Sequence, residues 1–241
     1  MIAVGLASSG CGRSSSGHQL VVSAASSLQD AFTAYAKQEF PGEEIKQSFA
    51  GSDDLAAQIR QGFQPDVYAA ADHDLPEQLH RDGLVEKPQV FAGNELVISV
   101  PKDSSISSLA DLEKPGTTLV IGDPSVPVGS YTREVLARLP AEERKAILDN
   151  VRSEEPEVSS VVGKVTEGAA DAAFAYVTDV KVAAGALRAI HLPQQLQPVI
   201  AYGIAIVRDA PNPALAKKFV TGLIDGPGAG ILRREGFLPP P

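Results

Sequence analysis

The stretch LVVSAASSLQDAFTAYA, residues 20–36, passes from a strand pattern to a helix pattern through a pair of serines. Its apolar start, Leu20–Ala24, is typical of a buried β-strand. After Ser27 the apolar side chains repeat at helical spacing and fall on one face: Leu28, Phe32, Tyr35 and Ala36. A strand that leads directly into an amphipathic helix predicts an α/β unit.

The same alternation continues along the chain, which predicts an α/β fold throughout. The expected strands lie at 44–49, 66–71, 95–101, 117–121, 171–177 and 199–207. The expected helices lie at 55–63, 134–148, 158–167 and 215–223. A chain of 241 residues is long enough for one large domain or for two lobes of roughly 100 residues each.

Composition narrows the class of protein. Hydrophobic residues make up 44% and charged residues 21%, which are ordinary values for a soluble globular protein. The net charge of -9 argues against nucleic acid as a partner, because phosphate backbones require a basic surface. A protein of this charge that binds a small anion must do so through local dipoles. No apolar run reaches the roughly 20 residues that a membrane-spanning helix needs.

Catalytic and metal-binding motifs do not stand out. The four histidines are scattered, and no cysteine–histidine cluster has the spacing of a metal site. Gly-x-Ser-x-Gly, His-Glu-x-x-His and P-loop motifs do not occur, so an enzyme remains only as a less favoured alternative.

The N-terminal segment has the pattern of a lipoprotein signal. Small and apolar residues precede Gly10-Cys11, and a Ser/Gly-rich linker follows at 12–17. This pattern predicts cleavage before Cys11 and lipidation of its sulfur. An ordinary N-terminus with a stray cysteine is the alternative. In either case residues 1–17 are set apart from the fold.

Four strand-to-helix turns carry small or hydroxyl residues: at Ser27, at Ser52, at 127–130 and at 157–159. Ligands of open α/β sheets bind outside the carboxyl ends of strands, where such turns lie. Free backbone N–H groups and the helix dipole make helix starts natural anion sites. Each serine taken alone has a plainer interpretation, as a helix N-cap.

Five blocks of sequence, in this order and spacing, resemble the periplasmic molybdate-binding protein family (ModA). The similarity extends over roughly residues 19–239. The blocks are Ala24-Ala-Ser-Ser-Leu28, Ser48-Phe-Ala-Gly-Ser52, Gly122-Asp-Pro-Ser-Val-Pro-Val-Gly-Ser-Tyr131, Gly168-Ala-Ala-Asp-Ala-Ala-Phe-Ala-Tyr-Val-Thr-Asp179, and Gly230-Ile-Leu232 with Gly236-Phe237.

The resemblance implies a two-lobed periplasmic-binding-protein fold of the type II, Venus-flytrap kind, with a ligand cleft between the lobes. It places residues 18–95 and 203–241 in lobe I and residues 96–202 in lobe II, with exchanges near residues 96 and 202. The implied ligand contacts are the hydroxyls of Ser27, Ser52 and Tyr176 and the backbone N–H groups of Val128 and Val158, with Ser26 as a second candidate at the first position.

Two positions need separate comment. Asp53 and Asp54 stand where the family usually has small or neutral residues, and their charges would repel an anion unless they point to solvent. Tyr176 has an alternative interpretation as a core aromatic with a hydrated hydroxyl.

The implied function is that of a monomeric substrate-binding subunit of an ABC importer, which captures molybdate or tungstate for a membrane permease. It needs no cofactor, and it is held outside the cytoplasm by a lipid anchor, in the periplasm or on the outer face. A site that offers only donors would disfavour protonated phosphate, whose O–H lacks an acceptor there. Receptors for sulfate, phosphate or iron on the same fold, and an effector domain of a transcription factor, are the alternatives.

Overall fold

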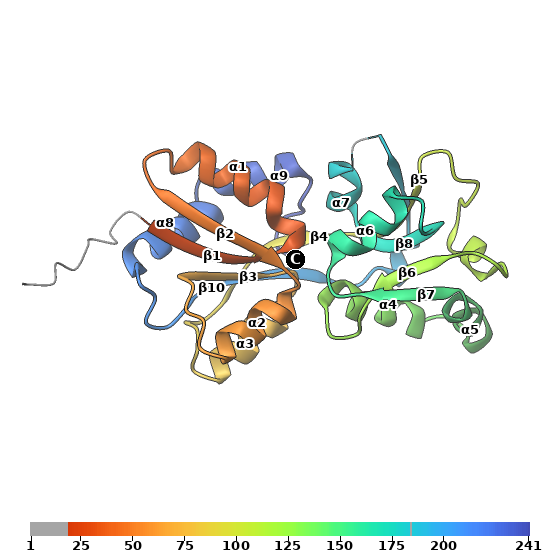
Figure 1. Cartoon of the computed structure of the whole chain (residues 1–241), viewed down its shortest axis with the longest axis horizontal. Coiled ribbons are helices and arrows are strands. Elements are labelled where there is room, and N and C mark those ends of the chain that lie inside the picture. Colours follow the sequence, from red (N-terminus) through yellow and green to blue (C-terminus); the bar gives the residue numbers. More distant parts are fainter. Residues whose placement is uncertain (1–18, 184) are drawn as a thin grey trace, which may run out of the picture.

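The computed structural model describes residues 19–183 and 185–241. It contains two lobes that lie side by side, each built around a five-stranded sheet with helices on its faces (Figure 1). We call them lobe I and lobe II in the order of the chain. The two-lobed α/β fold expected from the resemblance is therefore confirmed. The lipoprotein pattern that ends at Cys11 lies outside the described residues.

Lobe I has a mixed sheet with the strand order β2-β1-β3-β10-β4. The strand β1 runs parallel to β2 and β3, and β10 runs antiparallel to β3 and β4. The strands are β1 (Gln19–Ala25), β2 (Glu44–Ala50), β3 (Val67–Ala70), β4 (Gln89–Asn94) and β10 (Ile200–Ile206). The helices are η1 (Ser26–Leu28), α1 (Gln29–Glu39), α2 (Ser52–Arg60), α3 (Asp74–Arg81), α8 (Pro213–Ile224) and α9 (Pro227–Glu235).

Lobe II repeats this plan with the order β7-β6-β8-β5-β9. Here β6 runs parallel to β7 and β8, and β5 runs antiparallel to β8 and β9. The strands are β5 (Leu96–Pro101), β6 (Leu119–Gly122), β7 (Val151–Glu155), β8 (Ala172–Tyr176) and β9 (Leu187–His191). The helices are η2 (Leu109–Glu113), α4 (Pro127–Ala137), α5 (Ala141–Asp149), α6 (Val158–Thr166), α7 (Val177–Val182) and η3 (Gln194–Leu196).

The chain passes between the sheets twice. A single residue, Glu95, separates β4 in the first sheet from β5 in the second. The return lies between β9 and β10, and the exchange expected near residue 202 falls inside β10. β10 pairs with strands of lobe I along its whole length, so the chain has already returned to lobe I where β10 begins.

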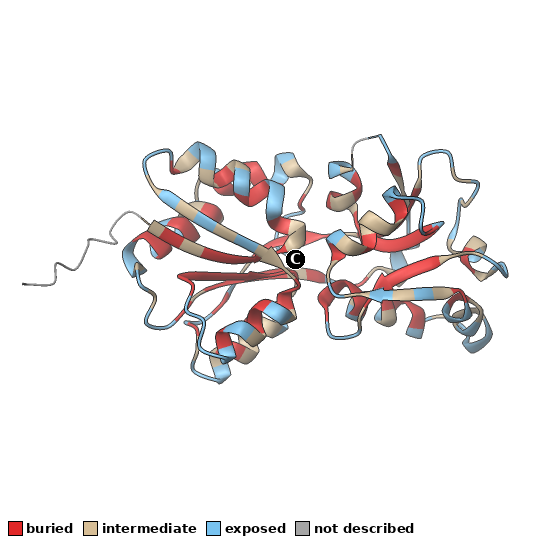
Figure 2. Ribbon diagram, in the orientation of Figure 1, coloured by how far each residue is buried: buried red, intermediate tan, exposed pale blue. Residues whose placement is uncertain are grey.

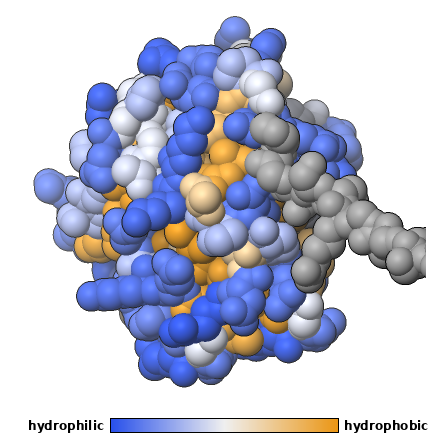
Figure 3. Space-filling view, turned by 90° about the vertical axis from the view of Figure 1, so that its left-hand side faces the viewer, coloured by the Kyte–Doolittle hydropathy of each residue, from blue (hydrophilic) through white to orange (hydrophobic). Residues whose placement is uncertain are grey.

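Burial follows the sequence pattern. Each sheet is buried between helices whose outer faces are exposed (Figure 2). On the first helix of the chain, Leu28, Phe32 and Tyr35 are buried as predicted, and Tyr35 packs edge-on against Phe219 of α8. The free end of lobe I is mainly hydrophilic, with narrow apolar strips between polar groups (Figure 3). Within the described residues, no helix is both long enough and apolar enough to cross a membrane.

The helix predicted at 134–148 is wrong as a single element. The structure has two helices there, α4 and α5, and Pro140 occupies the N-cap of the second. Proline has no N–H to donate and disfavours helical conformation in the residue before it. The α4 helix therefore ends before Pro140, and a new helix begins after it.

Candidate functional site

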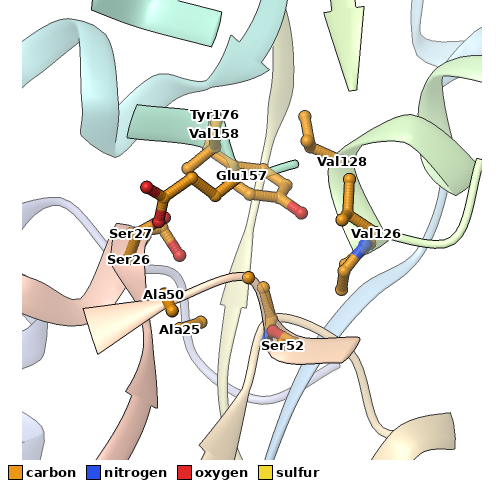
Figure 4. A pocket seen from close by; sticks show the side chains of 13 residues that line it. Ala25, Ser26, Ser27, Ala50, Ser52, Val126, Val128, Glu157, Val158 and Tyr176 are labelled. Carbon is orange, nitrogen blue, oxygen red and sulfur yellow. Dashed lines mark hydrogen bonds between the residues drawn. The ribbon is translucent and has the colours of Figure 1, made fainter. Parts of the chain in front are cut away.

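A small cavity lies where the two lobes face each other (Figure 4). Its volume is about 20 Å³, and a cavity needs roughly 10–15 Å³ on this measure to hold one water molecule. All six residues proposed from the sequence line it: Ser26, Ser27, Ser52, Val128, Val158 and Tyr176. The lining also includes Ala25, Ala50, Gly51, Ala71, Val126, Pro127 and Glu157.

Strand ends bring these residues together. In lobe I, β1 leads into η1 with its two serines, and β2 leads into α2, whose first residue is Ser52. In lobe II, β6 and β7 lead towards the starts of α4 and α6, and β8 ends at Tyr176. Parallel strands present their carboxyl ends at one edge of a sheet. The two sheets place these carboxyl-end edges against each other.

Helix starts supply backbone donors from lobe II. Val128 is the second residue of α4, after Pro127, and Val158 is the first residue of α6. The first four N–H groups of an α-helix have no partner within the helix. These groups carry the positive end of the helix dipole, so they suit an anion.

The serines do not act as helix caps. The N-cap positions are occupied by Ala25 for η1 and by Gly51 for α2, and neither helix has a side-chain capping bond within the described chain. Ser52 Oγ instead accepts a hydrogen bond from the Ala71 N–H at 3.1 Å. Ser27 Oγ lies 3.0 Å from Tyr202 Oη. The plain capping interpretation is therefore wrong for Ser27 and Ser52.

Tyr176 is a core aromatic that also lines the cavity. Its side chain is 1% exposed, and its ring lies edge-on to Tyr202 in the core. Its Oη is buried and has no hydrogen-bond partner among the described residues, although the residue lines the cavity. Burial raises the pKa of the Tyr176 hydroxyl well above its usual value, so the group remains a protonated donor.

The carboxylates considered from the sequence, Asp53 and Asp54, are not in the lining of the cavity. Asp54 is exposed, and Asp53 Oδ2 accepts a hydrogen bond from Ser125 Oγ of lobe II at 2.8 Å. However, Glu157, just before α6, lines the cavity. The expectation that the site offers only donors is therefore wrong, because a carboxylate accepts hydrogen bonds.

The backbone of Gly51 lies close to lobe II. A Cβ atom at this position would lie 2.5 Å from the Pro156 carbonyl oxygen, which belongs to lobe II. Sequence reasoning missed Gly51 and Glu157, together with the small residues Ala25, Ala50 and Ala71. Only the Gly-Ser pair at the end of β2 gave a local signal, because a glycine at a strand end often marks a close backbone approach.

The site does not have the composition of a cation site. Among residues 19–183 and 185–241, no group of three or more His, Cys, Asp or Glu side chains is placed to hold a metal ion. Apart from Glu157, the polar side chains of the lining are hydroxyls, which can donate to an anion with several acceptor atoms.

The fold and this site define an extracytoplasmic receptor for a small solute. The chain belongs to the family of bacterial extracellular solute-binding proteins, which it matches over residues 20–238. That family has a solute-binding role, not an enzymatic one.

Two relatives and one solved structure make the likeness specific. The chain is 38% identical to the molybdate-binding protein ModA of Mycobacterium tuberculosis, over 97% of this chain and 90% of the relative. It is 30% identical to YvgL of Bacillus subtilis, a putative ABC transporter substrate-binding lipoprotein, over 90% and 85%. The periplasmic molybdate-binding protein of Azotobacter vinelandii has the same fold, with a TM-score of 0.78, 24% identity, and coverage of 92% of this chain and 100% of that chain. The resemblance read from the sequence is confirmed.

Proposed function

We propose that the protein captures molybdate or tungstate outside the cytoplasm and delivers it to the permease of an ABC importer. The observation that carries this proposal is the convergence of hydroxyl donors from Ser27, Ser52 and Tyr176 with two helix starts on one cavity. The relatives named for molybdate binding point to the same ligand.

The chemistry of the cavity suits a fully deprotonated tetrahedral oxyanion. Such an ion carries acceptors only, and neutral O–H and N–H donors bind it through charge-assisted hydrogen bonds. The protein has a net charge of -9, so local dipoles must provide the attraction. The cavity of about 20 Å³ is small, which favours a small ligand in this arrangement of the lobes.

We further propose that Ser27, Ser52 and Tyr176 contact the oxyanion through their hydroxyls, and Val128 and Val158 through their backbone N–H groups. Ser26 is a second candidate beside Ser27. The two lobes separate to admit the ion and close over it. The protein acts as a monomer.

The first experiment compares four oxyanions. Molybdate and tungstate should raise the melting temperature, and sulfate and phosphate should do so far less. A ligand at ~100 times its dissociation constant stabilises the folded state by about 2.7 kcal/mol, which thermal-shift measurements resolve easily. The absence of a shift with either metal oxyanion would overturn the proposal.

The second experiment removes single hydroxyls. Tyr176→Phe and Ser52→Ala should each weaken molybdate binding by about 1.5–3 kcal/mol, or roughly 10- to 150-fold, because each removes a hydrogen bond to a charged ligand. Tyr35→Phe is a matched control, since this buried tyrosine donates to the Phe219 carbonyl away from the cavity. Calorimetry that finds parental affinity in both site variants would contradict the assigned contacts.

One observation favours a second candidate, a receptor for hydrogen phosphate. Glu157 lines the cavity and could accept the O–H of a protonated anion. Glu157→Gln distinguishes the two ligands. For molybdate, the loss of a nearby negative charge should strengthen binding; for hydrogen phosphate, the loss of the charged acceptor should weaken it.

We also propose that Cys11 carries the lipid that holds the protein at the membrane. The Gly10-Cys11 pair, the Ser/Gly linker after it and the lipoprotein relative YvgL support this anchor. Intact-mass measurement of membrane-extracted protein tests it. Unmodified Cys11 in a protein purified from the soluble fraction would refute the anchor and leave the ligand proposal untouched.

A further inference from the structure

A chain of buried polar groups leads from the cavity to the junction of the lobes. Ser27 Oγ lies 3.0 Å from Tyr202 Oη, and Tyr202 Oη lies 3.2 Å from Asn94 Nδ2. The same Asn94 Nδ2 donates to Thr178 Oγ1 of lobe II at 2.9 Å. Tyr202 is 0% exposed and Asn94 is 5% exposed, so neither exchanges these contacts for water easily.

The direction of these hydrogen bonds follows from Asn94. Its Oδ1 accepts from the Glu95 N–H at 2.9 Å, which fixes the orientation of the amide. The other end, Nδ2, has hydrogens and no acceptor site, so Tyr202 Oη must accept from it. Within the described chain, the remaining polar contact of Tyr202 Oη is Ser27 Oγ, so the tyrosine hydrogen points to Ser27.

The opposite direction is unfavourable. If Ser27 donated to Tyr202, the tyrosine hydrogen would face the Asn94 amide nitrogen, which cannot accept it. Burial also raises the pKa of Tyr202 well above its usual value, so the hydroxyl keeps its hydrogen. A buried donor left without an acceptor costs about as much as a lost hydrogen bond.

This order determines what Ser27 offers to a ligand. Its oxygen accepts from Tyr202, so its own hydrogen is available to the cavity. Ser52 is arranged in the same way, because its oxygen accepts from the Ala71 N–H. Tyr176 Oη also lines the cavity, and it has no partner among the described residues. The hydroxyls of Ser27, Ser52 and Tyr176 are therefore set to donate.

We propose that Asn94 and Tyr202 are positioning residues that hold Ser27 as a donor to the cavity and so strengthen the binding of an oxyanion. The proposal deepens the proposed function and rests on it. Neither residue needs to touch the ligand, since both act through the orientation of one serine hydroxyl.

Tyr202→Phe tests the proposal, because it removes the hydroxyl and keeps the ring in the core. Calorimetry at pH 7 should find molybdate affinity lowered by about 2- to 12-fold, as expected for one hydrogen bond. Tyr35→Phe is the matched control and should leave the molybdate affinity unchanged.

A double-mutant cycle separates positioning from a direct role. In a Ser27→Ala background, Tyr202→Phe should cause no further loss of molybdate affinity, because the group it orients is gone. Additive losses would show that Tyr202 acts without Ser27 and would overturn the proposal.

The two proposals fail in different ways. Wild-type protein that binds none of the four oxyanions would overturn the proposed function and this inference together. Wild-type protein that binds molybdate, with unchanged affinity in Tyr202→Phe, would overturn only the inference. If Tyr202→Phe does not fold, Asn94→Asp replaces it. The new carboxylate would accept the Tyr202 hydrogen and turn the Ser27 hydrogen towards the tyrosine, so molybdate affinity should fall; unchanged affinity would overturn the inference.

Discussion

The two walls of the cavity offer hydrogen-bond donors by different means. Lobe I uses side chains, the hydroxyls of Ser27 and Ser52. The Ser27 oxygen is hydrogen-bonded to the Tyr202 hydroxyl, and the Ser52 oxygen accepts from the Ala71 N–H. Lobe II uses mainly main chain, the starts of α4 and α6, with Tyr176 as its hydroxyl. The first wall depends on side-chain chemistry, and the second depends on the shape of its turns.

This difference determines which substitutions act on each wall. A hydroxyl can be deleted with little change to the backbone. A backbone N–H can be displaced only by changing the turn that holds it, and in lobe II this turn is packed closely against β6. Substitutions at glycines should therefore damage the second wall most, and substitutions at hydroxyls should damage the first wall in smaller steps.

The largest effect is expected at Gly129 in the first turn of α4. A Cβ atom there would lie 1.9 Å from the Asp123 carbonyl oxygen and 2.4 Å from that of Gly122. Because both atoms are backbone of the same lobe, Gly129→Ala must distort the turn. We expect a loss of about 3 kcal/mol or more in the free energy of unfolding, and no measurable molybdate binding.

The matched control for this variant is Gly163→Ala on α6. No atom lies within 4 Å of a Cβ at that position, and alanine favours a helix over glycine by about 0.5–1 kcal/mol. Urea denaturation should show the two variants moving in opposite directions. Parental stability in Gly129→Ala would mean that the turn is not rigid, and the contrast between the walls would fail.

A different outcome is expected at Gly51, where the obstruction lies across the cleft. The backbone of Gly51 has φ -56°, which alanine adopts freely. A Cβ there would lie 2.5 Å from the Pro156 oxygen of the other lobe and 2.9 Å from Asp53 Oδ1, which is the end of a side chain and can move. Gly51→Ala should leave the stability of the unliganded protein nearly unchanged, because the lobes can separate. Molybdate affinity should fall by about 2–3 kcal/mol, or roughly 30- to 150-fold, because closure is obstructed.

Calorimetry and denaturation together test this separation of fold from closure. Gly42→Ala is the control, since a Cβ there meets nothing within 4 Å. If Gly51→Ala binds molybdate as tightly as the parent, contact between Gly51 and Pro156 is not needed for binding.

The sequence predicted the parts of this site that are local and missed those that depend on packing. Strand ends and helix starts could be read from apolar spacing, and the family resemblance supplied all six candidate residues that line the cavity. The role of Ser27 could not be read, because Tyr202 follows it by 175 residues and meets it only in the folded sheet. The same holds for Gly51, whose neighbour Pro156 lies in the other lobe.

Local reasoning also erred where several interpretations were chemically sound. A serine at a strand-to-helix turn is a good cap, yet the Ser52 oxygen accepts a hydrogen bond from the N–H of Ala71, which lies on the neighbouring strand-to-helix connection. Glu157 reads as a polar residue before a helix, and only the meeting of the lobes places it in the lining. Contacts between lobes have no periodic signature in sequence.

A carboxyl group lies near each wall, Asp179 in lobe II and Asp72 in lobe I. The stability of the two walls should therefore depend on pH in different ranges. Burial raises the pKa of Asp179, which accepts from the Tyr176 N–H, from 3.8 to about 7. Burial likewise raises the pKa of Asp72, next to Ala71, from 3.8 to about 6. Each carboxyl binds its proton more tightly folded than unfolded, so its contribution to stability falls as pH rises from about 4 towards its folded pKa.

Asp179→Asn should therefore be more stable than the parent at pH 8, because the amide avoids a buried charge and can still accept from Tyr176. Asp72→Asn should show a smaller gain, with its pH dependence ending near pH 6. Thermal denaturation between pH 5 and pH 8 measures both. A parental pH profile in both variants would mean that neither carboxyl titrates in this range.

The smallest effect is expected at Ser125, whose hydroxyl joins the walls at their rim. Its Oγ lies 2.8 Å from Asp53 Oδ2 of lobe I and 2.8 Å from Asp123 Oδ1 of lobe II. One hydroxyl hydrogen serves two carboxylates, so only one of these hydrogen bonds is made at a time. The group is exposed, and water can replace it once the side chain is shortened.

Ser125→Ala should therefore lower molybdate affinity by less than about 1 kcal/mol, or roughly fivefold at most. The loss should appear mainly as faster release, because the Asp53 contact forms only when the lobes meet. Ser105→Ala, at an exposed serine of lobe II outside the cavity, is the control for stopped-flow release measurements. A loss as large as that of Gly51→Ala would show that the rim contact, and not the fit of backbone across the cleft, governs closure.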